Sequence, residues 1–284
     1  MLAVLHALNK STVYLAKKGV ESPRMNAELL LADVLNCKRL ELYLMYDRPL
    51  TEIELTKYRE YLKRRSTFEP TQYIIGTVEF YGLEFNVSPA VLIPRPETEI
   101  LVETVINSAN KEDALQIMDI GSGSGNITIA IAVNLPNTNI MGIEISESAI
   151  TIAKENLKKY SCNERVSFLK FDVLSVSKSE LPDIDIIVSN PPYVSKEDYG
   201  KVQKEILNYE PDIAVTDFYD GFKFYRKIIS LAAQLLKHNG KIFLEIAQGQ
   251  SKKINEIMKE HNFKEISIVQ DYQKIDRVIS GVQK

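Results

Sequence analysis

The first 68 residues carry apolar side chains at the spacing of α-helices. Two such series are Leu2, Leu5, Leu8 and Val13, and then Ala27, Leu30, Leu31, Val34 and Leu35. Ser22 and Pro23 precede the second series as a helix cap and a first-turn proline. Thr51 and Glu54 have the spacing of a capping box ahead of a third, charged helix. This part of the chain therefore predicts a small helical bundle.

Beyond residue 68 the period of the apolar positions changes. Tyr73, Ile75 and residues 78–80 alternate with polar positions, and the alternation resumes after Gly82 over residues 83–87. Alternation on both sides of a glycine turn is typical of a β-hairpin. We expect residues 69–96 to form a β-hairpin linker.

From residue 97 onward, candidate strands and helices alternate. Short apolar runs predict strands at residues 115–118, 138–143, 166–171, 184–189 and 241–246. Residues 127–133 and 222–236 predict helices, and Asn239 with Gly240 is expected to end the second of them. The stretch after residue 193 is polar and irregular as far as Glu210 and Pro211. Alternating strands and helices require a parallel sheet, so the predicted fold class is α/β, with this sheet in residues 97–284 and the helical bundle in residues 1–68.

The sequence NPPY, residues 190–193, directly follows a run that is predicted as a buried strand. Pro191 and Pro192 cannot donate to a sheet ladder, and they fix the backbone as it leaves the strand. The carboxamide of Asn190 and the ring of Tyr193 are thereby held at the carboxyl end of a strand, where open α/β sheets bind ligands. Such a site suits a planar amide or amino group. The alternative is a proline-rich turn with no ligand.

A glycine-rich segment, DIGSGSGN at residues 119–126, lies between a predicted strand and a predicted helix. Glycines allow a tight turn and let the backbone approach a ligand without an intervening Cβ. The dinucleotide fingerprint would need glycine or alanine at the position of Asn126, and no Gly-Lys-Ser/Thr of a P-loop follows. The segment indicates a nucleotide site of another kind, or an ordinary strand-to-helix turn.

Three carboxylates follow successive predicted strands: Asp119, Glu144 and Asp172. Glu144 is placed to accept both hydroxyls of a ribose, and Asp172 can accept from an exocyclic adenine amine. Each acid alone could be a solvated loop carboxylate. Together with the glycine loop they indicate a nucleoside pocket without a phosphate cradle.

Composition excludes few classes of protein. The 284 residues suffice for a sizeable domain and a smaller one, and the formal net charge of −3 gives no overall attraction to nucleic acid. Residues 63–65, Lys-Arg-Arg, are a candidate basic patch or a solvated helix end. Cys37 and Cys162 fit no disulfide or metal pattern, which indicates a reduced, cytoplasmic chain.

Several other classes of site have no support in the sequence. The scattered histidines, His6, His238 and His261, suggest neither a metal site nor a catalytic triad. No apolar run reaches membrane-spanning length, and the amino terminus lacks the order of a signal peptide. We expect no bound metal and no membrane partner.

The ordered set DIGSGSGN, Glu144, Asp172 and NPPY resembles the class I methyltransferases that use S-adenosylmethionine and modify an amide or amino nitrogen. Residues 69–76 (EPTQYIIG), residues 91–99 (VLIPRPETE) and NPPY, in this order, are similar to the protein-(glutamine-N5) methyltransferases of peptide chain release factors, the HemK/PrmC family. The resemblance covers nearly the whole chain. It implies a Rossmann-like sheet whose closing antiparallel strands lie near residues 266–268 and 278–279.

The resemblance also implies an activity and a set of site residues. The enzyme would methylate the side-chain nitrogen N5 of the glutamine in the Gly-Gly-Gln motif of class I release factors, and S-adenosylhomocysteine would be the product. The implied cofactor-binding residues are Asp119, Gly121, Ser122, Gly123, Ser124, Gly125, Glu144, Asp172, Val173 and Asn190. The glycine loop would hold the methionyl part, Glu144 the ribose, and Asp172 with Val173 the adenine. The helical domain would dock the substrate protein, and a monomer is expected.

For the substrate, the implied binding residues are Asn190, Pro191, Pro192 and Tyr193, of which Asn190, Pro191 and Tyr193 are catalytic. The side-chain oxygen of Asn190 and the backbone carbonyl of Pro191 can each accept one N–H of the glutamine amide. Tyr193 would wall the slot and pack on the amide plane.

The chain departs from the common family pattern at two places. Glu144 stands where aspartate is frequent, which preserves the ribose role, and residues 245–250 (EIAQGQ) replace a more glycine-rich turn. Arg95 either shapes the entrance of the pocket or is a rigid linker residue.

Two other functions stay open. A DNA adenine-N6 methyltransferase shares NPPY, but it must flip its base and would need a basic duplex-binding surface and a recognition segment. A non-catalytic module could keep the shape of the pocket, but it would not need Asn190 together with the full glycine loop.

Overall fold

The computed structural model describes residues 2–284, and they form two compact units. One unit runs up to Thr77 and also includes residues 203–209. The other contains residues 78–202 and 210–284. The first unit therefore extends beyond residue 68 and takes up a short segment from the second half of the chain.

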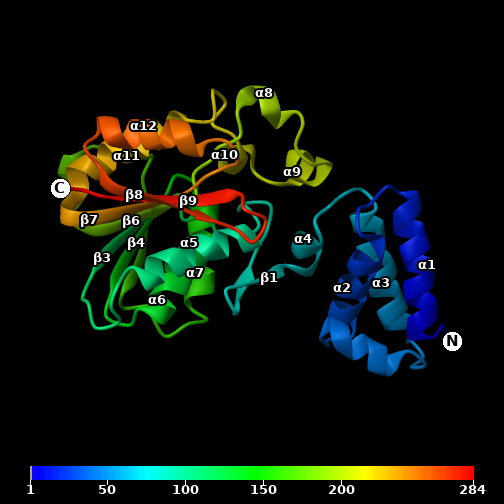
Figure 1. The fold of residues 1–284 in the computed structure, drawn as a ribbon. Coiled ribbons are helices and arrows are strands. Elements are labelled where there is room, and N and C mark those ends of the chain that lie inside the picture. The colour runs from blue at the N-terminus through cyan, green and yellow to red at the C-terminus, as the bar shows by residue number, and fades with distance from the viewer. Residues whose placement is uncertain (1) are drawn as a thin grey trace. The chain divides into compact units, whose positions relative to one another are not determined.

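The first unit is helical (Figure 1). Its elements are α1 (Val4–Lys17), α2 (Pro23–Val34), the 3₁₀ helix η1 (Arg39–Met45), α3 (Glu52–Arg65), α4 (Thr71–Ile75) and α9 (Lys204–Tyr209). The capping box of Thr51 and Glu54 at the start of α3 is confirmed. Pro23 occupies the first turn of α2, but Ser22 makes no side-chain cap hydrogen bond and has φ 46°.

The buried face of α1 differs from the predicted one. Val4, Leu8 and Leu15 are fully buried, whereas Leu5 is 37% and Val13 is 54% exposed. The prediction placed Leu5 and Val13 on the core side and was wrong there. A 3.6-residue period admits more than one apolar stripe in this sequence, and only packing against α2 selects one of them.

The expected hairpin is present but shorter. The strands β1 (Thr77–Phe80) and β2 (Leu83–Asn86) pair around Gly82, and Phe80 and Phe85 bury their rings. Residues 71–75, which were expected to alternate as a strand, instead form α4. That helix ends at Gly76, whose φ of 93° is readily accessible only to glycine.

The second unit is built on a seven-stranded sheet in the order β5-β4-β3-β6-β7-β9-β8. The strands are β3 (Gln116–Ile120), β4 (Asn139–Glu144), β5 (Val166–Lys170), β6 (Ile184–Ser189), β7 (Leu236–Glu245), β8 (Lys264–Gln270) and β9 (Asp276–Val282). Strands β3 to β7 pair in parallel, and β9 is antiparallel to both β7 and β8. This confirms the predicted parallel sheet with antiparallel closing strands.

Helices cover both faces of the sheet (Figure 1). One face is covered by α5 (Pro96–Asn107), α6 (Asn126–Asn134) and α7 (Glu147–Leu157), and the other by α11 (Lys223–Leu235) and α12 (Ser251–Glu260). Alternate residues of β3 serve the two cores: Ile117 packs toward α6, and Met118 packs toward α11. The order of strands reverses between β3 and β6, and open α/β sheets bind ligands at such a point.

Two expectations about connections are corrected by the structure. Asn239 and Gly240 do not end a helix but lie within β7, which begins at Leu236 directly after α11. Asn239 adopts φ 63° there, and its N–H donates to Gln283 O at 2.8 Å. The polar stretch between residue 193 and Pro211 is not irregular, because it contains α8 (Lys196–Tyr199) and α9, and α10 (Asp212–Val215) follows it directly.

No helix within residues 2–284 is both long and apolar enough to cross a membrane. Within the same residues, histidine, cysteine and carboxylate side chains form no group of three or more that could hold a metal ion.

Candidate active site

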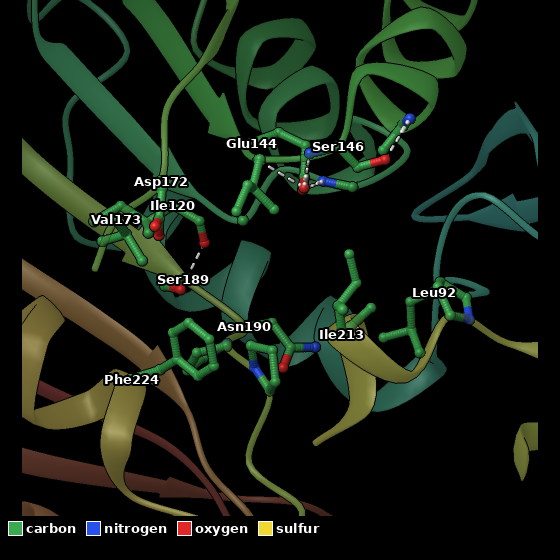
Figure 2. A pocket seen from close by; sticks show the side chains of 18 of the residues that line it. Leu92, Ile120, Glu144, Ser146, Asp172, Val173, Ser189, Asn190, Ile213 and Phe224 are labelled. Atoms are coloured by element: carbon green, nitrogen blue, oxygen red, sulfur yellow. Dashed lines mark hydrogen bonds between the residues drawn. The ribbon is translucent and has the colours of Figure 1, made fainter. Parts of the chain in front are cut away.

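A cavity of about 260 Å³ opens at the carboxyl ends of β3, β4 and β6. All the residues that line it belong to the second unit. In Figure 2, Glu144 and Asp172 lie along one side of this cavity, and Asn190, Ile213 and Leu92 lie along the other. The cavity occupies the edge of the sheet at which the sequence predicts a nucleoside pocket.

The glycine loop forms one wall of the cavity through Gly121 and Gly123. Their φ angles are 78° and 51°, and a Cβ at either position would meet no atom within 4 Å. The space beside them is therefore left open to a ligand. The loop is fixed from behind, because the N–H groups of Gly121 and Ser122 donate to Ile143 O at 2.8 and 3.2 Å.

The remaining loop residues predicted as cofactor contacts do not line the cavity. Gly125 has φ 80°, and a Cβ there would lie 2.9 Å from the ring of Phe168, so this glycine permits close packing of α6 on the sheet. Ser122 and Ser124 are buried, and the Ser124 hydroxyl donates to Asn126 Oδ1 at 3.2 Å. Direct cofactor contacts by these three residues stay a prediction.

Glu144, the last residue of β4, lines the cavity with its carboxylate held in a fixed position. Its Oε1 accepts from the backbone N–H groups of Ile145 and Ser146 at 2.9 and 3.0 Å, and Oε2 accepts from Gly123 N–H at 3.0 Å (Figure 2). Each carboxylate oxygen has two acceptor positions, so Oε1 is fully used and Oε2 can still accept from a hydroxyl.

Asp172 and Val173 line the same side of the cavity just after β5. Asp172 Oδ1 accepts from the N–H of Leu174 at 2.9 Å, which orients the carboxylate. Apolar side chains from Ile120, Ile143 and Phe224 surround this region of the pocket. A polar acceptor at the rim of an apolar slot suits a heteroaromatic ring that carries an amine.

Asn190, Pro191 and Pro192 line the opposite side of the cavity, immediately after β6. The end of the strand is anchored by the Ser189 hydroxyl, which donates to Ile120 O at 2.6 Å. Asn190 Nδ2 donates to the hydroxyl of Thr98 at 3.1 Å. The side-chain nitrogen of Asn190 is thus bonded within the protein.

Tyr193 does not line this cavity. It packs against the core between the sheet and α11, and it borders a separate hollow near Gly249 and Gln250. Burial raises the pKa of its hydroxyl well above the usual value. Its predicted role as the wall of the substrate slot stays a prediction, whereas its packing shows that it supports the bend after Pro192 from the inside.

Asp119, the third predicted acid, is fully buried behind the glycine loop and does not line the cavity. Its Oδ2 accepts from the Thr128 hydroxyl at 2.6 Å, and its Oδ1 has no hydrogen-bond partner within the described chain. Burial raises the pKa of this carboxyl to about 7. The geometry makes Asp119 a buried acceptor behind the loop.

Sequence reasoning missed the wall formed by the segment around α10. Ile213, Ala214, Thr216 and Phe218 all line the cavity, although the sequence predicted no structure or role for residues 212–218. Nothing in their spacing marks a binding surface. Only Pro211, at the start of this segment, signalled a defined bend.

Arg95 and Glu210 hold this segment in place. Glu210 is buried, its Oε1 pairs with the Arg95 guanidinium, and its Oε2 accepts from Ile93 N–H at 3.2 Å. Arg95 does not line the cavity, so its contribution to the entrance is indirect. The same contacts account for Glu210 and Pro211 as structural residues.

The residues present fit S-adenosylmethionine. An adenosyl group needs an apolar slot, an acceptor for its amine and an acceptor for a ribose hydroxyl, and Asp172 and Glu144 supply these polar groups beside the apolar lining. The open space beside Gly121 and Gly123 is the space that a bulky methionyl chain requires.

Comparisons with protein-family models identify both parts of the chain. Residues 6–76 match the PrmC N-terminal domain, and residues 111–280 match a methyltransferase domain. The two matches agree with the helical first unit and with the sheet-bearing second unit.

Solved structures share the fold at low sequence identity. The hMettl16 catalytic domain, solved in complex with a MAT2A 3'UTR hairpin, has a TM-score of 0.57 at 15% identity and covers 78% of this chain and 81% of its own. A methyltransferase from Pyrococcus furiosus has a TM-score of 0.51 at 17% identity, over 72% of this chain and 90% of its own. These likenesses establish the class I methyltransferase fold alone.

Similar sequences narrow the assignment. A release factor glutamine methyltransferase from Fusobacterium nucleatum is 42% identical over 97% of this chain and 77% of its own length. Proteins of the same name from Chlorobaculum tepidum and Geobacter sulfurreducens are 35% and 38% identical, over 98% and 94% of this chain and 96% and 92% of their own lengths. Because these proteins are 35–42% identical to this chain over nearly its whole length, and because residues 6–76 match the family's amino-terminal domain, the chain belongs to the release factor glutamine methyltransferases.

Proposed function

We propose that this protein transfers a methyl group from S-adenosylmethionine to the side-chain nitrogen N5 of the glutamine in the Gly-Gly-Gln motif of class I release factors. The observation that carries the proposal is the position of the Asn190 carboxamide. It lies across a single cavity from Glu144 and Asp172, the residues that suit an adenosyl group (Figure 2). A flat amide at Asn190 would therefore lie close to a methyl donor held by the other side of the cavity.

The chemical problem is one of positioning. The nitrogen of a carboxamide is a poor nucleophile, because its lone pair is delocalised into the carbonyl. S-adenosylmethionine supplies a strongly electrophilic methyl group when it is bound. The protein must hold the amide nitrogen in line with that methyl group at near-attack distance, and such positioning can supply much of the rate.

Asn190 and Pro191 orient the amide in this proposal. The Oδ1 of Asn190 accepts one N–H of the substrate glutamine, and the backbone carbonyl of Pro191 accepts the other. Both acceptors favour the positive charge that develops on the nitrogen during transfer. Pro191 has no N–H to compete for the substrate, and Pro192 fixes the angle of the bend. No strong general base is needed, because the methylated amide is acidic enough to lose its proton to water.

Glu144, Asp172 and the glycine loop hold the cofactor in this proposal. Glu144 binds the ribose hydroxyls, Asp172 with Val173 binds the adenine, and Gly121 and Gly123 accommodate the methionyl chain. The backbone donors on Glu144 hold its carboxylate in a fixed position, so it need not reorganise when a ligand binds.

The helical first unit is proposed to dock the release factor, and the enzyme is proposed to act as a cytoplasmic monomer. The second candidate, DNA adenine-N6 methylation, lacks a favouring observation. Two of the three residues of the basic run at residues 63–65 are engaged within the protein: Arg64 pairs with Glu69, and Arg65 is buried and pairs with Glu205.

The experiment is methyl transfer from labelled cofactor to purified release factor, with duplex DNA in a parallel reaction. We expect label on the release factor, none on DNA, and none on a release factor whose Gly-Gly-Gln glutamine is replaced by alanine. Transfer to DNA, or to the substituted release factor at the full rate, would overturn the proposal.

Asn190→Ala tests the assigned role of the carboxamide. The loss of one acceptor aimed at the transition state should lower kcat by about 100-fold. The dissociation constant for S-adenosylhomocysteine, measured by calorimetry, should change by less than about threefold, because the adenosyl contacts lie on the other side of the cavity. Asn137→Ala, at an exposed turn residue, is the matched control and should retain full activity.

A further inference from the structure

One of the buried carboxylates that the proposed mechanism does not use lies next to the start of NPPY. Glu245, the last residue of β7, is 3% exposed, and its Oε2 has no hydrogen-bond partner within the described residues. Strand β7 pairs in parallel with β6, with Leu244 opposite Ser189. Glu245 therefore lies beside Asn190 at the edge of the sheet.

Thr98 completes this cluster from a third element. It lies in the first turn of α5 and is 2% exposed, and its hydroxyl accepts from Asn190 Nδ2 at 3.1 Å. Because its oxygen accepts from Asn190, the hydroxyl proton of Thr98 is free to point to another acceptor. Against the larger effect of burial, hydrogen bonding from the Thr98 hydroxyl and from the Asn190 side chain acts to lower the pKa of the Glu245 carboxyl.

The cluster determines which end of the Asn190 carboxamide faces the substrate. A carboxamide has two N–H donors and one acceptor oxygen. With Thr98 and Glu245 both serving as acceptors, the nitrogen end of Asn190 is held inside the protein. A flipped carboxamide would turn Oδ1 toward the Glu245 carboxylate and bring two acceptors together in a buried site, which is costly.

We propose, on the basis of the proposed function, that Thr98 and Glu245 are positioning residues. They determine which of the two orientations the Asn190 carboxamide adopts, so that its Oδ1 faces the amide of the substrate. Neither residue needs to touch substrate or cofactor. The proposal gives a physical role to the carboxyl end of β7 and to the segment that opens α5.

Other charged groups around Glu245 come from every neighbouring element. Glu97 on α5 and Arg277 on β9 act on its carboxylate with opposite signs, and Tyr193 and Tyr225 lie nearby. Burial is the largest influence and raises the pKa of Glu245 to about 7. The acceptor state of Glu245 is therefore expected to form as the pH rises through neutrality.

The kinetic test compares Thr98→Val, Thr98→Ser and Glu245→Gln with Thr104→Val as the control. Thr104 is on the same helix, and its hydroxyl donates only to Ile100 O at 2.6 Å. Loss of the acceptor in Thr98→Val should lower kcat about tenfold with little change in cofactor affinity, and Thr98→Ser should restore it to within about twofold. In Glu245→Gln, the new side-chain amide can donate to Asn190 Oδ1 and so stabilises the flipped carboxamide. We therefore expect kcat to fall about tenfold, and the increase of kcat with pH near 7 to disappear.

A second readout uses the ligand-free protein and no activity. The side-chain amide protons of Asn190, assigned by comparison with Asn190→Asp, should exchange slowly in the wild type and at least about tenfold faster in Thr98→Val. Unfolding in urea identifies a variant that fails to fold, and if Thr98→Val does so, the exchange data for Glu245→Gln decide the question.

The outcomes separate the two proposals. If the wild type does not methylate release factors, the proposed function fails. If the wild type is active but Thr98→Val and Glu245→Gln keep kcat, the pH profile and the exchange rates within about twofold of the wild type, the positioning role is overturned and the function stands.

Discussion

At the residue scale, two carboxylates close to the cavity are buried away from water. Asp119 and Glu245 are each fully or almost fully buried, and burial raises the pKa of both to about 7. An unfolded chain would release both protons near pH 4. Between about pH 4 and pH 7 the folded protein therefore holds protons that the unfolded chain has lost, so both groups make stability fall as the pH rises.

Asp119→Asn should remove this penalty at one of the two positions. The free energy of unfolding of the ligand-free protein should rise by about 2 kcal/mol at pH 8, where the wild-type carboxyl is ionised in a buried site. It should change little at pH 4, where that carboxyl is neutral in the folded protein and about half protonated in the unfolded chain. Urea unfolding at the two pH values measures the difference. An equal change at both would show that Asp119 does not titrate in this range.

The sequence predicted the residues of this site better than their mutual arrangement. Glu144, Asp172 and Asn190 follow strands, and the parallel sheet brings strand ends together, so their convergence followed from the strand pattern. The Thr98–Asn190 bond joins residues 92 positions apart on different elements, and no local pattern predicts such a contact. Burial of Asp119 behind the loop also depends on packing that spacing does not show.

At the scale of elements, close packing of the glycine loop on β4 sets the shape of the cavity. Gly142, in the middle of β4, faces the back of the loop, and a Cβ there would lie 2.6 Å from the Phe168 ring and 2.9 Å from Ser122 Cβ. The strand can therefore have no side chain at this point. A glycine in a strand interior often marks such a close approach.

Gly142→Ala should destabilise the protein by about 2 kcal/mol, because Phe168 and the loop must shift to admit the methyl group. The cofactor affinity should also weaken, since the shift moves Ser122 and the loop beside the ligand. Gly200→Ala is the control: it adds a methyl group with nothing within 4 Å and should change stability by less than about 0.5 kcal/mol. Thermal unfolding and calorimetric titration give the two quantities.

Element types were predicted well where apolar runs are long and bounded, as for β3 to β6 and α6. The prediction that Asn239 and Gly240 end a helix was wrong. The two residues form a bend within β7, and their backbone is hydrogen-bonded to Gln283. The short helices α8 to α10 could not be predicted. Their residues carry no apolar period, and their positions depend on distant partners such as Arg95.

At the scale of the whole molecule, the two units are not consecutive along the chain. Residues 203–209, between α8 and α10, belong to the first unit. There Glu205 pairs with the buried guanidinium of Arg65, and the Tyr209 hydroxyl donates to Thr67 O at 3.0 Å. The first unit is thus completed by a segment that follows NPPY in the sequence.

Glu205→Ala should weaken this association, because it leaves the buried charge of Arg65 without its carboxylate. The expected loss in the free energy of unfolding is about 2 kcal/mol, less than for a fully buried pair since Glu205 is 22% exposed. Cleavage by a protease within residues 203–209 should become faster. Glu197→Ala, at an exposed position on α8, is the control, and equal cleavage rates in the two variants would contradict the prediction.

The chain passes between the two units three times, at residues 77–78, 202–203 and 209–210. Dividing the chain once, near residue 77, therefore does not give two complete domains. The amino-terminal piece would lose α9 and leave Arg65 without its counter-ion, and the carboxy-terminal piece would keep residues 203–209 without the residues that they contact. A chimaera that takes its first unit from a relative of this enzyme would fold only if residues up to 77 and residues 203–209 were exchanged together.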